Sequence, residues 1–221
     1  MGTLIERKKK IMIAGMARLV PQGYKQLKYL ENTSGAYIVT DVTPSEALGF
    51  DCTFMPFGSY TNQTNQFGCI FGGRKASANN DYQLTTWTDF TQSGGVYVYR
   101  HGTLRLGNQI DAGMIGQNVK QTAKCRNKAY TGPDGVVVNV PAYTWANDAC
   151  PIYLFALNTN GSPVQQGPGC RIYRIKFYNG DELIRDYVPA KRKSDNVLGV
   201  YERVVGQFLI NAGSGSFTTE T

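Results

Sequence analysis

The chain has 221 residues, of which 42% are hydrophobic and 18% are charged, and 25 are glycine. So few charges, together with 14 tyrosines and 10 phenylalanines, exclude a coiled coil, a long helical bundle and a disordered chain. They favour a β-protein rich in aromatic residues and glycine. No stretch reaches 18 apolar residues, so we expect no membrane span.

The first 20 residues are basic and apolar and differ from the rest of the chain. Of the net charge of +7, +4 lies in residues 1–20, which leaves +3 for the other 201 residues. The apolar stretch 11–17 is short for a signal peptide, and Arg18 follows it at once. Glu6 stands where N-myristoylation requires Ser or Thr.

We therefore interpret residues 1–20 as a docking arm that contacts a partner protein. The side chains expected to make that contact are Arg7, Lys8, Lys9, Lys10, Ile11, Ile13 and Arg18. Nucleic acid is a less favoured partner, because four clustered charges attract phosphates only weakly. Residues 21–221 are expected to form one domain.

From residue 24 onward, short apolar or alternating runs are separated by turns of Gly, Asn, Asp and Pro. Fifteen such runs at this spacing predict an antiparallel sandwich of two sheets. The predicted strands are residues 26–30, 36–40, 50–55, 67–72, 81–87, 95–100, 104–109, 119–123, 127–131, 136–140, 152–157, 170–178, 182–188, 197–201 and 207–210.

The strongest local signal is a hairpin around Asn179 and Gly180, two residue types that tolerate a positive φ. The strand before it alternates, which places Tyr173, Ile175 and Phe177 on one face. With a three-residue loop, Arg174 would lie opposite Asp186 and form a cross-strand ion pair.

The sequence contains no residue pattern that indicates a catalytic site. A sandwich glycosidase needs two carboxylates about 5–9.5 Å apart, and the spacing Glu-x-Asp-x-x-Glu does not occur. Glu182 and Asp186 share a strand face but lie beside Arg185. The single histidine, His101, excludes a two-histidine metal site within one chain, and its surroundings are typical of a hairpin turn. We expect no catalytic residues and no enzymatic activity.

The five cysteines, Cys52, Cys69, Cys125, Cys150 and Cys170, are widely spaced, which excludes a Cys-x-x-Cys pair. We interpret them as reduced and mostly structural. No Asp-x-Asp-x-Asp-Gly run indicates calcium, and we expect no cofactor and no metal site. A calcium site assembled from separate loops stays open as an alternative.

Two polar loops with aromatic residues, 57–66 and 143–148, are candidates for carbohydrate binding. Sugar rings stack on aromatic side chains while amides and carboxylates bind the hydroxyl groups. The candidate residues are Tyr60, Asn62, Asn65, Trp145, Asn147 and Asp148. The simpler interpretation is that Trp145 anchors its loop on the core and that the amides are only solvated.

Five stretches share a pattern with a known family: YKQLKYLENTSGAYI at 24–38, FGGR at 71–74, IYLFALN at 152–158, RIYRIKFYNGDELIRDYVPA at 171–190 and GVYERVVGQFLINAG at 199–213. Together they resemble the concanavalin A-like, or laminin-G-like, domains of bacteriophage and gut-bacterial surface proteins. The resemblance implies a jelly-roll sandwich of two antiparallel sheets. The resemblance does not extend to residues 1–20. This sequence also lacks the carboxylate motif that the family's glucanase branch carries.

The resemblance also implies a function, although one sandwich fold hosts several. We expect a non-enzymatic virion protein of a bacteriophage, in a fibre, tail or head decoration. Its domain would contact host-surface glycans or sister subunits, and the arm would dock on other virion proteins. A homo-oligomer is expected, and symmetric fibres favour a trimer. The alternatives are a secreted or surface lectin-like adhesin of a gut bacterium and, less favoured, a polysaccharide-degrading enzyme.

Overall fold

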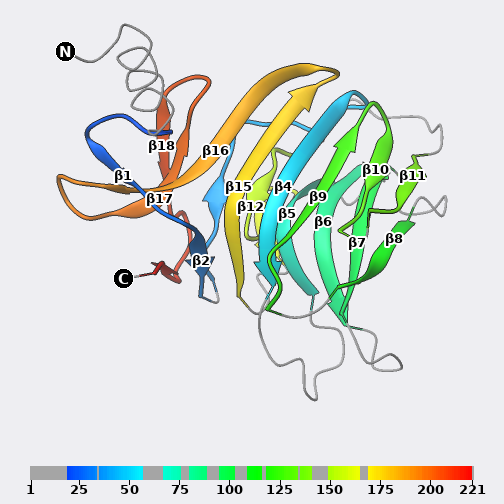
Figure 1. The fold of residues 1–221 in the computed structure, drawn as a ribbon, viewed down its shortest axis with the longest axis horizontal. Helices are drawn as coiled ribbons and strands as arrows, with labels where there is room; N and C mark the ends of the chain where they lie inside the picture. Colours follow the sequence, from blue (N-terminus) through cyan, green and yellow to red (C-terminus); the bar gives the residue numbers. More distant parts are fainter. Residues whose placement is uncertain are drawn as a thin grey trace, which may run out of the picture.

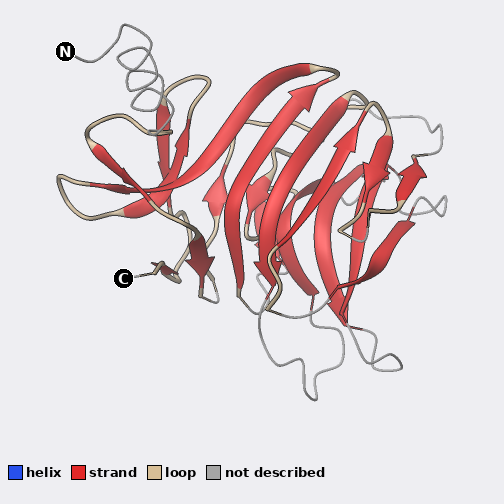
Figure 2. Cartoon of the chain, viewed as in Figure 1, coloured by secondary structure: helices blue, strands red, loops and turns tan. Residues whose placement is uncertain are grey.

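The computed structural model describes residues 19–33, 35–56, 67–75, 80–88, 95–102, 109–115, 118–133, 135–140, 149–164 and 169–220. Within these ranges all regular structure is β-strand, and no helix occurs (Figure 2). The strands form two curved sheets that lie face to face (Figure 1). The prediction of an all-β protein with two sheets is therefore confirmed.

The larger sheet has one long path of strands and three short additions. In spatial order the path is β11 (Val137–Asn139), β10 (Ala129–Thr131), β9 (Gln121–Arg126), β4 (Leu48–Pro56), β15 (Cys170–Asn179), β16 (Glu182–Arg192), β17 (Leu198–Glu202) and β18 (Gln207–Ile210). The additions are β1 (Tyr24–Gln26), which pairs with β16, and β2 (Leu30–Asn32), which pairs with β15 and with β19 (Phe217–Thr218).

The smaller sheet follows the order β14 (Ser162–Val164), β13 (Leu157–Thr159), β5 (Phe67–Lys75), β6 (Asn80–Thr88), β7 (Gly95–Gly102) and β8 (Gln109–Ile115). The short strand β12 (Tyr153–Leu154) pairs with β5 and with β3 (Ile38–Val39). Pairing is antiparallel throughout the described strands except between β13 and β5, which run parallel.

Aromatic side chains fill the space between the sheets. Phe50 of β4 and Phe177 of β15 contact Phe71 of β5 edge-on, with ring centroids 5.0 and 5.4 Å apart. The buried Tyr82 hydroxyl of β6 donates a hydrogen bond to the Leu48 carbonyl of β4 over 3.0 Å. Burying one such ring stabilises the fold by about 1.5–3 kcal/mol, so this cluster fixes how the two sheets stack.

Several predicted elements differ from the observed ones. The predicted strand 152–157 is divided into β12 and β13, because the buried Phe155 takes a positive φ of 65°. His101 lies within β7 and pairs with Tyr82, so its assignment to a turn was wrong. The predicted strand 104–109 falls almost wholly outside the described residues, and the strand found there is Gln109–Ile115.

The predicted hairpin is present with a shorter loop. Asn179 pairs with Glu182, so only Gly180 and Asp181 form the loop, and Gly180 alone has a positive φ, of 58°. This is the conformation that a type II′ turn requires at its first loop position. The three-residue loop and the register were therefore wrong.

The predicted ion pair nevertheless forms. The register places Lys176, not Arg174, opposite Asp186. Arg174 lies two residues before Lys176 on β15 and binds Asp186 diagonally through two hydrogen bonds of 2.7 Å. Diagonal neighbours in a sheet are about 7–8 Å apart at the backbone, which the long arginine side chain spans.

The strands β1, β17, β18 and the end of β16 form a projection, here called the wing, beside the region where the two sheets overlap (Figure 1). The wing has its own apolar cluster, which consists of Val20, Val188 and Ala190 with the partly buried Leu19, Tyr24, Tyr201 and Phe208. Leu19 and Val20, assigned to the arm in the sequence analysis, thus pack on the domain.

Candidate functional site on the larger sheet

The residues predicted to bind carbohydrate lie outside the described residues, and so do those of the arm. The first group is Tyr60, Asn62, Asn65, Trp145, Asn147 and Asp148, and the second is Arg7, Lys8, Lys9, Lys10, Ile11, Ile13 and Arg18. Their roles therefore stay predictions. A different set of polar side chains comes together on the outward face of the larger sheet.

Alternation along the strands creates this face. On β9, Gln121, Ala123 and Cys125 are buried, while the residues between them point outward. On β4 and β15 the same alternation turns phenylalanines and isoleucines toward the core and polar residues away from it. Residues that pair across neighbouring strands share a face, so the outward residues of β9, β4, β15 and β16 form rows.

One row is made of charges. Asp51 of β4 pairs with Lys124 of β9 on one side and with Lys176 of β15 on the other, and Lys176 pairs with Asp186 of β16. The neighbouring row carries hydroxyl groups, because Thr53 pairs with Thr122 and the two hydroxyl oxygens are 3.0 Å apart. The face therefore offers cations, carboxylates and hydroxyl groups within a few residues of one another.

Three tyrosine rings on this face are each covered by a cation. Arg126 lies over the ring of Tyr178, whose hydroxyl donates to Asp51 Oδ2 over 3.0 Å. The Lys120 ammonium lies 4.5 Å from the centre of the Tyr173 ring. The Arg171 guanidinium lies 4.3 Å from the centre of the Tyr29 ring and donates to Glu31. Such cation–π contacts hold the cationic groups in place on the sheet surface.

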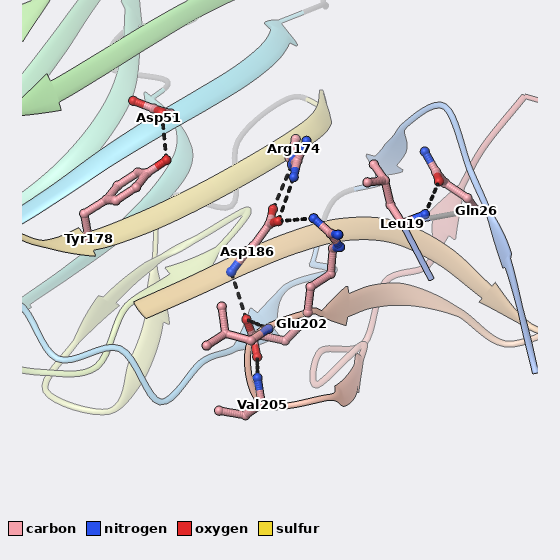
Figure 3. A network of polar contacts seen from close by, with 10 residues as sticks. Leu19, Gln26, Asp51, Arg174, Tyr178, Asp186, Glu202 and Val205 are labelled. Atoms are coloured by element: carbon pink, nitrogen blue, oxygen red, sulfur yellow. Dashed lines mark hydrogen bonds and ion pairs between the residues drawn. The ribbon is translucent and has the colours of Figure 1, made fainter. Parts of the chain in front are cut away.

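Asp186 is the centre of a charged network at the edge of this face (Figure 3). Arg174 donates two hydrogen bonds of 2.7 Å to its carboxylate, and Arg203 donates one of 2.6 Å. Only 2% of Asp186 is exposed. Burial raises the pKa of this carboxyl, but the hydrogen bonds and charges of Arg174 and Arg203 outweigh burial and lower the pKa below its ordinary value.

The second buried carboxylate, Glu202, binds backbone groups instead of side chains. Its Oε1 accepts from the amides of Asp186 and Val204 at 2.8 and 2.9 Å, and its Oε2 accepts from the amide of Val205 at 2.6 Å (Figure 3). Glu202 thereby joins the turn between β17 and β18 to β16. Both buried carboxylates are thus engaged in holding the sheet together.

Ten charged side chains on this surface are together called the basic face. They are Lys120, Lys124, Arg126, Arg171, Arg174, Lys176, Arg203, Glu31, Asp51 and Asp186. Sequence reasoning identified only the pair of Arg174 and Asp186. The signal it missed is the alternation of basic with apolar residues in 121–126 and 171–176. Only the strand order shows that these segments lie on either side of β4.

A shallow depression of about 260 Å³ lies at one end of the larger sheet, lined by Glu46, Ala47, Asn127, Lys128 and Gly180. Three turns meet there, and they are joined by the ion pair of Lys128 with Glu46 and by the hydrogen bond from Asn127 to Asp181. The polar groups of this depression are therefore engaged in contacts with one another.

Within the described ranges, no three His, Cys, Asp or Glu side chains are grouped so that they could hold a metal ion. The same part of the chain has no helix long and apolar enough to cross a membrane. The five cysteines are free thiols, four of them buried. Comparisons with protein-family models, with curated proteins and with solved structures gave no match.

Proposed function

We propose that the chain is a non-enzymatic structural component of a bacteriophage virion, in a fibre, tail or head decoration. Its β-sandwich contacts host-surface glycans or sister subunits, and its N-terminal arm docks on another virion protein. The homo-oligomer favoured by fibre symmetry is a trimer.

The observation that carries the proposal is how the five family-like stretches meet in space. Residues 71–72 pair with 153–154, residues 30–31 pair with 171–172, and residues 188–190 pair with 199–201. A Cβ atom on Gly213 would collide with the carbonyl oxygen of Gly35, so the first and last stretches also touch. The family-like stretches thus pair with one another within each of the two sheets, which supports the jelly-roll expectation.

The chemistry of the buried carboxylates also favours binding over hydrolysis. A general acid in a glycosidase needs a raised pKa, so that its carboxyl is protonated near neutral pH. The two arginines have the opposite effect on Asp186. Glu202 accepts three backbone hydrogen bonds, so its two carboxylate oxygens are engaged in holding the turn after β17.

The position of Leu19 supports a role for the arm as an anchor. Leu19 packs on the wing, and its amide donates to Gln26 Oε1 over 3.3 Å (Figure 3). In the larger sheet the wing strands lie at the opposite end of the path from β9, β10 and β11 (Figure 1). An attachment at the wing therefore leaves the other end of the sheet accessible to a ligand.

Deletion of residues 2–18 tests the proposal and keeps the packed Leu19 and Val20. We expect the shortened chain to unfold at the temperature of the full chain but to be absent from purified phage particles. A full-length control, with residues 2–18 replaced by a neutral Gly/Ser segment, separates loss of charge from loss of length. Undiminished incorporation of the shortened chain would contradict the anchor. A mature protein that begins near Pro21 on a bacterial surface would favour the adhesin.

A further inference from the structure

We propose that the basic face of the larger sheet binds an acidic polysaccharide, a polymer whose sugar units carry carboxylate groups beside their hydroxyl groups. This inference rests on the proposed glycan-contacting function and names the ligand class and its surface. The surface differs from the two loops that the sequence analysis selected.

Charge is concentrated on this face. Its seven cations and three carboxylates give a net charge of +4, whereas residues 21–221 together carry +3. The rest of the domain therefore sums to −1, and the positive potential of the domain originates from the cations of β9 and β15 and of the segments next to them. Clustered charge of one sign attracts a polymer of the opposite sign and increases its association rate.

Three of the cations are available to a ligand. The ion pairs of this face engage Arg126, Arg171, Arg174 and Arg203, and no described carboxylate lies within 4 Å of the ammonium groups of Lys120, Lys124 and Lys176. Lys124 and Lys176 flank Asp51 in register, so their backbones are two strand spacings apart, about 10 Å. They present two separate positive groups along one row.

The covered tyrosine rings indicate which polymer fits. Neutral sugars and single-stranded nucleic acids bind protein aromatics through exposed ring faces. Here Tyr29 and Tyr178 are buried, and arginines lie over both rings, while Lys120 lies over Tyr173. The face therefore offers charge and hydrogen bonds and little ring surface for stacking.

The carboxylates and hydroxyl groups among the cations favour a sugar polymer over nucleic acid. Asp51 can accept hydrogen bonds from sugar hydroxyls, and the exposed Thr122 can donate to them or accept from them. Single-stranded nucleic acid gains affinity by stacking its bases on exposed aromatic rings, and the buried Tyr29 and Tyr178 offer no such ring face. An acidic polysaccharide combines charges with many hydroxyl groups and suits such a mixed surface.

The test measures binding of the full chain to fluorescein-labelled alginate, a polymer of uronic acids, by fluorescence anisotropy. The face variant is Lys124→Gln/Lys176→Gln. The control variant is Lys25→Gln/Lys191→Gln, which removes two lysines that also pair across strands but lie on the wing. Both variants lose the same charge and keep the arm, so only the position of the charge differs.

We expect alginate affinity to fall roughly tenfold in the face variant and less than about threefold in the control. Affinity should also fall between about 50 mM and about 200 mM salt. Any of three results would overturn the inference. These are an equal loss of alginate affinity in both variants, binding of neutral dextran as strong as that of alginate, and displacement of alginate by a single-stranded oligonucleotide at equal charge. If the wild-type chain does not bind alginate but is still incorporated into particles through its arm, the inference about the face is refuted and the proposed function stands.

Discussion

Replacing Asp186 by asparagine should destabilise the sandwich by about 2–3 kcal/mol at neutral pH. The carboxylate is 2% exposed and accepts three hydrogen bonds of 2.6–2.7 Å from two arginines. Hydrogen bonds to a charged group contribute about 1.5–3 kcal/mol each when buried. The side chains of Arg174 and Arg203 are 32% and 34% exposed and regain water in the variant, so the sum must be discounted.

The assay is urea unfolding followed by tryptophan fluorescence, with Asp195→Asn as the control. Asp195 also pairs with an arginine, Arg192, but its side chain is 42% exposed. The control should therefore unfold at the same urea concentration as the wild type. For a domain of this size, the Asp186→Asn variant should also melt roughly 4–12 °C lower.

The pH dependence of this difference has a definite sign. The folded-state pKa of Asp186 is lower than its value in the unfolded chain, about 3.9. Its contribution to stability is therefore complete above the unfolded pKa and is lost as pH falls through the folded pKa. The stability difference between wild type and Asp186→Asn should be constant from pH 7 to pH 5 and shrink below about pH 4. A variant as stable as the control, or a difference that grows on acidification, would refute the reasoning.

Two further predictions concern the close contacts and the thiols. Gly213→Ala should cost about 1–3 kcal/mol in thermal unfolding, because its Cβ would collide with the Gly35 carbonyl; Gly23→Ala, which has nothing within 4 Å, should not destabilise the fold. In native protein, iodoacetamide should modify Cys150 first, as peptide mass spectrometry would show, because the other thiols are buried and burial raises the pKa of Cys52. Rapid labelling of any buried cysteine in the native protein would contradict this packing. The buried cysteines are Cys52, Cys69, Cys125 and Cys170.

The fold could be predicted from the sequence where the signal is local. Alternation and Gly180 located the β15–β16 hairpin, because side-chain period and turn conformation depend on neighbouring residues. The break at Phe155 could not be found in the same way. A positive φ is rare for a bulky residue, and the ring of Phe155 is buried in the core, with its centroid 5.1 Å from that of Phe217 in a distant part of the sequence.

The basic face could not be predicted from the sequence. Lys124 and Lys176 are 52 positions apart in the sequence, and each appears as an ordinary outward residue of its own strand. They become neighbours of Asp51 only because β4 lies between β9 and β15. Strand order in a sheet depends on packing across the whole domain, so a chain read segment by segment does not reveal a surface shared by three strands.

The network that stabilises the larger sheet also limits how strongly its face attracts anions. Arg174 and Arg203 belong to the basic face, yet both donate to the Asp186 carboxylate. Asp186→Asn removes a negative charge and frees hydrogen-bond donors of both arginines, so we expect this variant to bind alginate more tightly while it unfolds more easily. If the network only stabilises the fold, Asp186→Asn should be less stable than the wild type and bind alginate with unchanged affinity. Anisotropy titration and urea unfolding of the same variant therefore separate the two roles, and weaker binding by the folded variant would contradict the proposed face.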